Sequence, residues 1–217
     1  MSEPPLRASI IPVTPLQQNC TLLWCTATMR GAFCDPGGDL PRLKTAAEKF
    51  GVTIEKILLT HGHIDHCGSA GLLARELGVS IEGPHEADRY WIDRLAEDGA
   101  KYGIPGCSFE PSRWLVDGDQ VTVGNLTFGV RHCPGHTPGH VVFHHPESKI
   151  ALVGDVLFRG SVGRTDLREG DWPTLQASIA SLLAEYPPET PVLSGHGDPT
   201  TLGEELATNP FLEELRR

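Results

Sequence analysis

Short segments in which apolar and polar residues alternate recur along the chain, and turns rich in Gly, Pro and Asp separate them. This alternation is typical of β-strands that bury one face. In the first half it predicts antiparallel strands that lead to the turn Pro36-Gly37-Gly38, and then two further strands. The expected strands cover 8–14, 19–26, 30–35, 53–60 and 79–83. In the second half the pattern predicts a strand meander within 113–133 and strands at 140–145, 149–155 and 190–196.

Apolar residues spaced three and four apart predict helices between these strands. The expected helices cover 39–51, 68–78, 85–98 and 171–186. Asp171 is placed to cap the last of them, with Pro173 in its first turn. Thr201 and Glu204 have the spacing of a capping box, which predicts a final short helix. The Gly- and Pro-rich segment 99–111 is expected to be irregular.

The two halves of the chain follow the same plan, because each is rich in strands and is completed by helices. Sheets and helices bury their apolar faces in packed layers. This order of elements therefore predicts an α/β protein, a four-layer αβ/βα sandwich with both sheets inside and the helices outside. No shift in composition marks a linker, so residues 1–217 are expected to form one domain.

Polar clusters rich in His and Asp stand directly after four of the apolar strands. They are THGHIDH (60–66), CPGHTPGH (133–140), GDVLF (154–158) and SGHGD (194–198). Rigid strands hold the loops that follow them, and such loops commonly supply ligand-binding groups. A lone His near a core is commonly structural, but four such clusters favour one shared metal site. Imidazole and carboxylate groups are ligands for zinc, iron and manganese.

The first cluster carries three imidazoles and a carboxylate within six residues. Gly62 separates His61 from His63 and favours an extended loop over a helix. In an extended segment, the side chains of His61, His63 and Asp65 point to one side and His66 must point to another. This one segment is therefore expected to supply ligands to two metal ions.

Charge and composition narrow the classes of partner. The net charge of −10 disfavours nucleic acid, because phosphate binding requires a surface of Lys and Arg. No apolar run reaches the roughly 18 residues that a membrane span requires. The N-terminal segment lacks the basic end and the apolar core of a secretory signal, so a cytoplasmic protein is expected. The six cysteines form no C-x-x-C pair and are expected to be reduced rather than to hold zinc.

These clusters resemble the motifs of the metallo-β-lactamase superfamily. Residues 61–66 match its signature H-x-H-x-D-H, and a distant His, Asp and His follow in order. More narrowly, CPGHTPGHVVF, GDVLFRGSVGRTDL and GHGDPTTLGEE followed by NPFL are similar to the glyoxalase II branch, the hydroxyacylglutathione hydrolases. The compact single-domain bacterial form matches best. The resemblance covers nearly the whole chain and implies the metallo-β-lactamase fold.

The resemblance also implies two divalent metal ions and a set of ligands for them. The first ion would be bound by His61, His63 and His136, and the second by Asp65, His66 and His196, with Asp155 bridging. Zinc is favoured, with iron or manganese as alternatives. Two such ions, two carboxylates and a bridging hydroxide leave a net positive site, which suits an anionic substrate.

The reaction that the resemblance implies is hydrolysis of a small acyl thioester by a metal-bridging hydroxide. In the glyoxalase II branch this converts S-lactoylglutathione to glutathione and lactate. Asp65 is the candidate catalytic group, which would take the proton of the hydroxide. Two-domain members of this branch contact glutathione through a helical C-terminal domain that this chain is not expected to have. Recognition of glutathione therefore stays open at this point.

Other reaction classes also stay open. Persulfide dioxygenases of the same superfamily use one iron ion and share the motif GRTD, found here at 163–166. A lactonase or a β-lactamase-type hydrolase is a weaker alternative. Metal storage is disfavoured, because structural zinc sites are usually closed and rich in Cys, whereas the implied ligands here are imidazoles and carboxylates.

Several residues near the motifs have two interpretations. Arg159 and Arg164 are candidates for binding a substrate carboxylate, but pairing of Arg164 with Asp166 or Glu169 is an equally good explanation. His140 is expected to orient a metal ligand rather than to bind the metal. Structural, surface or solvated positions are expected for the remaining candidates, His85, His132, His144, His145, Cys67 and Cys133.

Overall fold

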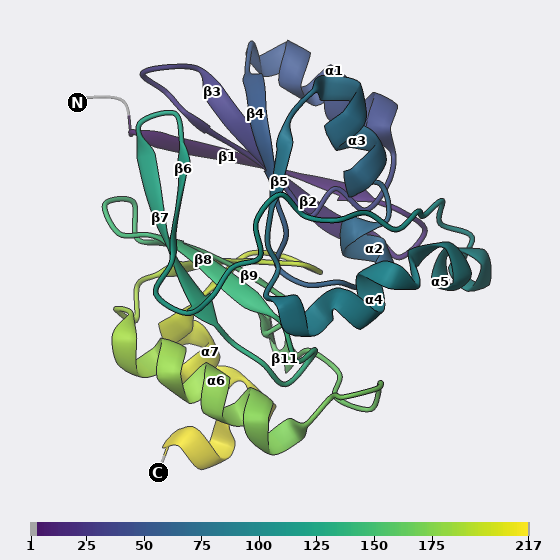
Figure 1. Ribbon diagram of the computed structural model, residues 1–217. Helices are drawn as coiled ribbons and strands as arrows, with labels where there is room; N and C mark the ends of the chain where they lie inside the picture. The colour runs from purple at the N-terminus through teal and green to yellow at the C-terminus, as the bar shows by residue number, and fades with distance from the viewer. Residues whose placement is uncertain (1–3, 217) are drawn as a thin grey trace.

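The computed structural model describes residues 4–216, and its two large β-sheets pack face to face (Figure 1). The first sheet has the strand order β1-β2-β3-β4-β5. Its strands are β1 (Leu6–Val13), β2 (Gln18–Cys25), β3 (Arg30–Cys34), β4 (Thr53–Leu58) and β5 (Ser80–Glu82). The first three are antiparallel, whereas β3, β4 and β5 run parallel. The parallel pairs are connected through helices α1 (Leu40–Phe50) and α3 (Ala70–Leu77).

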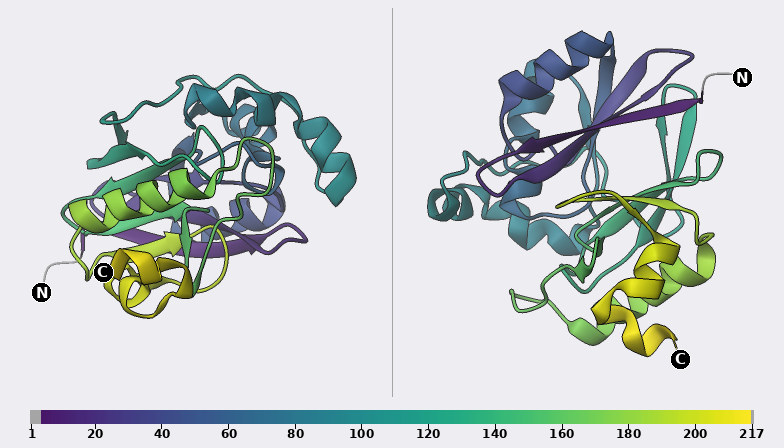
Figure 2. Two further views of the ribbon diagram at one scale, coloured as in Figure 1. Left: turned by 90° about the horizontal axis from the view of Figure 1, so that it is seen from below. Right: turned by 180° about the vertical axis from the view of Figure 1, so that it is seen from behind.

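The second sheet has the strand order β13-β12-β9-β8-β7-β6. Its strands are β6 (Gln120–Val123), β7 (Leu126–His132), β8 (Val141–His145), β9 (Ile150–Gly154), β12 (Pro191–Ser194) and β13 (Thr200–Thr201). Helices α6 (Trp172–Glu185) and α7 (Leu202–Thr208) lie on its side of the molecule (Figure 2). A short hairpin of β10 (Leu157–Phe158) and β11 (Ser161–Val162), which the sequence did not predict, forms a separate small sheet. Within residues 4–216, none of the helices combines the length and apolar character needed to cross a membrane.

Three apolar layers separate the four layers of secondary structure. The inner layer, between the sheets, includes Leu58 and Phe143. A second layer packs Leu43 of α1 and other helix residues against the first sheet. A third packs Leu175 and Ile179 of α6 against the second sheet. The predicted αβ/βα sandwich is thus confirmed, and burial of these layers supplies the main favourable free energy of folding.

Local signals account for the boundaries that the sequence predicted correctly. Before α6, the side-chain carboxylate of Asp171 accepts a hydrogen bond from the backbone N–H of Thr174 at 2.9 Å. Before α7, the hydroxyl of Thr201 accepts one from the backbone N–H of Glu204 at 3.2 Å. Each bond satisfies a donor that has no partner inside the helix. α1 ends at Gly51, whose φ of 67° favours glycine.

The segment after β5 differs from the prediction of one helix over 85–98. It consists of a 3₁₀ turn (Glu86–Asp88), α4 (Arg89–Asp93) and α5 (Leu95–Tyr102). α5 therefore continues into the stretch that was expected to be irregular. Gly99 lies inside this helix, at a close packing contact. A Cβ at Gly99 would lie 2.3 Å from the carbonyl oxygen of Ile104, where the chain folds back onto α5.

The strand meander predicted within 113–133 is only partly formed. β6 and β7 form the expected hairpin, but the residues at its start do not join the second sheet. The backbone N–H of Ser112 donates to the carbonyl of Ile81, and that of Gly83 donates to the carbonyl of Arg113, both at 2.8 Å. This stretch therefore runs beside β5, because the edge of the first sheet offers it hydrogen-bond partners.

Candidate metal centre

The four clusters rich in His and Asp meet at one edge of the two sheets. They follow β4, β7, β9 and β12. β9 and β12 are parallel neighbours, with Gly154 opposite Ser194. Asp155 and His196 follow closely after these positions, and the Oδ2 of Asp155 lies 3.7 Å from the Nε2 of His196. Strand pairing thus brings together residues that are far apart in the sequence.

The side chains form three groups of potential metal ligands, and the ligand atoms within each group lie within 4.8 Å of one another. One of them, Asp35, His61 and His66, overlaps the other two, which contain the implied ligands. The first group is His61, His63 and His136, and the second is Asp65, His66 and His196. Asp155 lies between the groups. Its Oδ1 is 3.2 Å from the Nε2 of His66, and its Oδ2 is 3.6 Å from the Nε2 of His136. All seven residues implied as ligands are therefore brought together.

The conformation of the first cluster corrects one prediction. Residues 61–63 are not helical, but Ile64–Cys67 forms the short helix α2. Asp65 therefore joins His66 in the second group instead of pointing to the same side as the two preceding histidines. All four residues of α2 are buried, and the N–H groups at its end donate to carbonyl oxygens one turn earlier. A helical turn satisfies buried backbone groups that an extended loop would leave unpaired.

Buried polar atoms in both groups have no hydrogen-bond partner among residues 4–216. They are the Nε2 atoms of His61, His63, His66 and His136, and the Oδ1 of Asp155. An unpaired buried polar atom costs free energy, so such atoms normally have a partner. Imidazole nitrogens and carboxylate oxygens are ligands for divalent cations such as zinc and iron. The residues present therefore fit the binding of divalent metal ions.

Burial keeps the imidazoles of the first group in the form that binds metal. It lowers the pKa of His63 to about 3 and holds the pKa values of His61 and His136 below the ordinary histidine value. Burial by itself would raise the pKa of Asp65, but the neighbouring imidazoles, His66 first, lower it. Neutral imidazoles and ionised carboxylates are the ligand forms that metals require.

His66 differs from the other imidazoles. Burial by itself would lower its pKa, but the carboxylates of Asp155 and Asp65 raise it well above the ordinary value. These carboxylates stabilise positive charge at the ring, whether a proton or a metal cation carries it. The second group is therefore a site of negative potential that suits a cation.

Hydrogen bonds behind the rings fix their orientation. The Nδ1 of His61 lies 3.0 Å from the hydroxyl oxygen of Thr60, and the Nδ1 of His136 donates to the carbonyl oxygen of Arg164 at 2.7 Å. With Nδ1 engaged, the Nε2 atoms of these rings face the other way. Partners of this kind set the tautomer and the angle of a metal-binding imidazole.

Asp35, which the sequence did not identify, supports both groups. Its Oδ2 lies 2.9 Å from the Nδ1 of His66. Its two oxygens accept hydrogen bonds from the N–H and the hydroxyl of Thr60 at 2.8 and 2.6 Å. One buried carboxylate therefore orients His66 directly and His61 through Thr60. Its position at the end of a predicted strand was a usable signal, but an Asp before Pro-Gly-Gly is also a typical turn residue.

Asp88, also unidentified from the sequence, joins the two loops that carry the first group. Its carboxylate accepts hydrogen bonds from the N–H of Gly62 at 2.8 Å, the hydroxyl of Thr137 at 2.8 Å and the N–H of Gly139 at 2.6 Å. A Cβ at Gly139 would lie 2.5 Å from the nitrogen of Asp88, so only glycine allows this approach. Burial raises the pKa of Asp88 to about 7 against the effect of these bonds.

His140 is buried beside the first group without being part of it. Its ring stacks on His61, with centroids 4.7 Å apart and planes at 18°. Its Nε2 accepts a hydrogen bond from the backbone N–H of Asp155 at 3.0 Å. These contacts support the expectation that His140 orients proposed metal ligands, His61 through the stacked ring and Asp155 through its backbone N–H.

A cleft of about 650 Å³ opens onto both groups. Arg164 lies on its wall and forms a bidentate ion pair with Asp166, with both N–O distances at 2.7 Å. Arg159 does not line the cleft and faces Glu204 and Asp198 at 3.4 and 3.9 Å. Of the two arginines considered for substrate binding, Arg164 is the one positioned to meet a molecule in the cleft.

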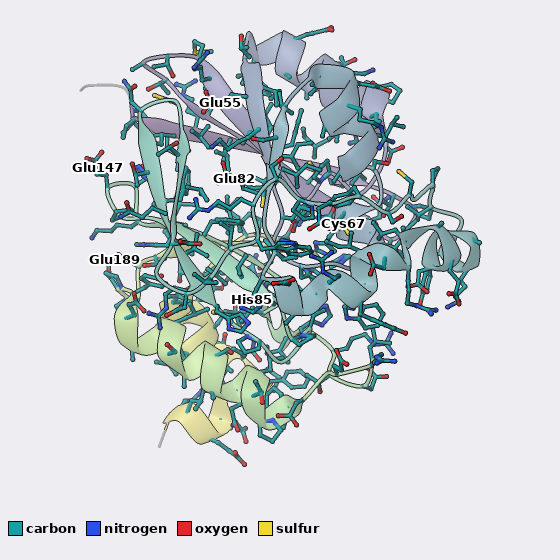
Figure 3. The ribbon with its side chains drawn as sticks, viewed as in Figure 1. Glu55, Cys67, Glu82, His85, Glu147 and Glu189 are labelled. Atoms are coloured by element: carbon teal, nitrogen blue, oxygen red, sulfur yellow. The ribbon has the colours of Figure 1, made fainter. Side chains whose placement is uncertain are left out.

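The remaining candidates are packed rather than free. His85, expected in solvent, is half-buried and stacks on His132 with ring centroids 4.4 Å apart. The thiol of Cys67 donates to carbonyl oxygens one turn earlier in the chain. Figure 3 labels His85 and Cys67 in the middle of the molecule. Fully buried positions are found for His145, Cys67 and Cys133.

Sequence comparison relates the chain to known proteins along nearly all of its length. The sequence model of the metallo-beta-lactamase superfamily matches residues 13–196. Hydroxyacylglutathione hydrolase GloC of Haemophilus influenzae is 41% identical over 209 residues, which are 95% of this chain and 98% of that protein. The probable metallo-hydrolase YqgX of Bacillus subtilis is 33% identical over 205 residues, which are 93% of this chain and 95% of that protein.

Several solved structures have the same fold as this chain. The BLEG-1 B3 metallo-beta-lactamase superposes with a TM-score of 0.87 at 36% identity, covering 95% of this chain and 100% of that one. TTHA1623, solved in a di-iron-bound form, has a TM-score of 0.84 at 38% identity, covering 94% and 100%. ETHE1 from Myxococcus xanthus, at 23% identity and a TM-score of 0.74 over 94% and 83%, shares the fold. The chain belongs to the metallo-β-lactamase superfamily.

Proposed function

We propose that this metal-dependent hydrolase cleaves a small acyl thioester, S-lactoylglutathione, into glutathione and lactate. The observation that supports this most is the pair of ligand groups joined by Asp155, with buried ring nitrogens that have no other partner among the described residues. Support for the substrate comes from the similar Haemophilus influenzae protein, which is named a hydroxyacylglutathione hydrolase.

The proposed cofactor is a pair of divalent metal ions. The first would be held by His61, His63 and His136, the second by Asp65, His66 and His196, and both by Asp155. Zinc is favoured by the ligand types, and iron is the alternative because TTHA1623 was solved in a di-iron-bound form. When bound, two such ions lower the pKa of a shared water and polarise the substrate carbonyl.

Asp65 is the residue proposed to accept the proton of the attacking water. Its Oδ2 lies 3.2 Å from the Nε2 of His196 and 3.7 Å from the Nε2 of His66, and the residue lines the cleft. The neighbouring imidazoles, His66 first, lower its pKa, so the carboxylate is ionised at neutral pH. The thiolate leaves without being protonated first, so no separate general acid is needed.

A substrate panel tests the reaction class. Incubation of the metal-loaded protein with S-lactoylglutathione should release free thiol without consuming oxygen. Lactones and β-lactams should be turned over much more slowly, because they offer no thiolate leaving group. The measurements are thiol titration and an oxygen electrode. Oxygen uptake with glutathione persulfide, together with an inert thioester, would instead assign a mononuclear-iron persulfide dioxygenase.

Metal removal tests the number of ions. Dialysis against a chelator should abolish thioester hydrolysis, and added Zn²⁺ should restore it in proportion up to two equivalents per chain. The reason is that Asp155 contacts both ligand groups, so neither group alone presents the complete site. Activity and bound metal are measured on the same samples. Full activity at one equivalent would contradict the two-metal arrangement.

A further inference from the structure

Helices α4 and α5 form one wall of the cleft, and α5 projects from the body of the molecule in both views of Figure 2. Arg94, Asp98 and Lys101 lie on this wall. Arg94 lies between α4 and α5, and Asp98 lies 3.7 Å from Arg94 and 2.8 Å from Lys101, so these three side chains form a row. The row begins next to the metal centre, because Trp91 packs edge-on against the ring of His63 with centroids 4.6 Å apart.

Outside the metal centre, the cleft carries more cations than anions, although the protein as a whole is acidic. Apart from the proposed metal ligands, the charged residues of the cleft are the cations Arg94, Lys101 and Arg164 and one carboxylate, Asp98. The chain has 28 acidic and 18 basic side chains and a net charge of −10. A local excess of cations in a recess of an acidic protein attracts and orients an anion.

The ion pairs already formed on this wall leave the cations accessible. The Nη2 of Arg94 lies 2.6 Å from Glu97 and 3.7 Å from Asp98. The side chain of Arg94 is 29% exposed and lines the cleft, whereas that of Glu97 is 58% exposed and does not line it. The Nζ of Lys101 lies 2.8 Å from Asp98, and the Lys101 side chain is 53% exposed. Exposed ion pairs are held weakly because water screens them. An anion in the cleft can therefore displace Glu97 and share the cations with Asp98.

The position of the row sets the kind of ligand. Trp91 lies beside the metal centre, and Lys101 lies ten positions further along the chain, near the end of α5. A thiol that reaches the row must therefore extend away from the metal centre and carry an anionic group. A short neutral thiol has no group that these cations would bind.

We propose that Arg94 and Lys101 bind a carboxylate at the far end of the thiol half of the substrate. The substrate class is then a thioester of an anionic thiol, and α4 and α5 supply the contacts that select it. The proposal rests on the proposed thioester hydrolysis and adds the element that recognises the leaving group.

Two lactoyl thioesters test the proposal, one of glutathione and one of N-acetylcysteamine, whose thiol arm is short and neutral. In Lys101→Gln and Arg94→Gln, kcat/KM for the glutathione thioester should fall about tenfold through a higher KM, as expected for loss of a charge-assisted contact. In the same variants, kcat/KM for the neutral N-acetylcysteamine thioester should change less than twofold. Lys149→Gln is the matched control, because Lys149 pairs with Glu189 at 2.7 Å in a similarly exposed position, and Figure 3 places Glu189 on the side away from α5.

Equal losses on both thioesters, or no loss on either, would overturn the proposal while leaving thioester hydrolysis intact. If the unmodified protein cleaves neither thioester, the proposed function fails. The proposal that Arg94 and Lys101 bind a carboxylate is then tested by measuring ligand binding instead of turnover. The probe is then S-methylglutathione, which cannot be hydrolysed, in calorimetric titration against the metal-loaded protein. Weaker binding to the Lys101→Gln and Arg94→Gln variants than to Lys149→Gln would support the site, and equal binding would refute it.

Discussion

Asp65→Ala is expected to lower kcat for thioester hydrolysis by roughly 10²–10⁴-fold, the usual contribution of a positioned general base. The carboxylate of Asp65 reaches the cleft, and its Oδ2 lies 3.2 Å from the Nε2 of His196. Its removal takes away both a proposed metal ligand and the proposed proton acceptor. The measurement is kcat at saturating substrate and excess Zn²⁺, with bound metal determined on the same sample.

Asp65→Asn separates the two roles. The amide keeps an oxygen that can bind metal but has no basicity, so this variant should bind more metal than Asp65→Ala and be as slow. Recovery of kcat in Asp65→Asn along with the bound metal would show that ligation is the only role of Asp65. Near-normal turnover of either variant at full metal occupancy would contradict its assignment as the proton acceptor.

The clusters that hold the seven proposed ligands could be found from the sequence because each cluster follows an apolar strand, and the family resemblance then implied which residues are ligands. His61 and His63 follow β4, and Asp155 and His196 follow β9 and β12, which pair in parallel. The hydrophobic pattern locates such strand ends, and a sheet brings its strand ends together. The division of the ligands between two ions came from the family resemblance. Spacing alone predicted an extended segment, and the helical turn α2 contradicts this for Asp65.

Asp35 and Asp88 could not be assigned from the sequence, because their function depends on tertiary contacts. Asp88 bonds residues that lie 26 to 51 positions away, and Asp35 bonds residues 25 and 31 positions away. In the sequence, Asp88 lies in a helical segment, where a carboxylate normally faces solvent. The close approach of Ile104 to Gly99 of α5 is likewise a contact that no local pattern shows.

Asp88→Ala is expected to destabilise the protein and to weaken the first metal site selectively. It would leave the buried N–H groups of Gly62 and Gly139 and the hydroxyl of Thr137 without their acceptor. Each unsatisfied buried donor costs about 1–3 kcal/mol, so the free energy of unfolding should fall by roughly 3 kcal/mol or more. Urea unfolding of the metal-free protein measures this loss.

The selective effect on metal follows from which loops Asp88 joins. Gly62 lies between His61 and His63, and Thr137 follows His136, so all three ligands of the first group depend on this carboxylate for their spacing. Affinity there should fall about 10–100-fold, as for other residues that orient metal ligands. The second group is anchored instead through Asp35 and should keep its affinity.

Calorimetric titration with Zn²⁺ should therefore resolve one weakened and one unchanged site in Asp88→Ala. Asp93→Ala is the matched control, since Asp93 lies in the adjoining helix α4 but is exposed. Its stability should change by less than about 0.5 kcal/mol, as is usual for surface substitutions. Equal weakening of both sites would mean that Asp88 only stabilises the fold. Unchanged affinity at both would show that the His61–His63 and His136 loops keep their spacing without it.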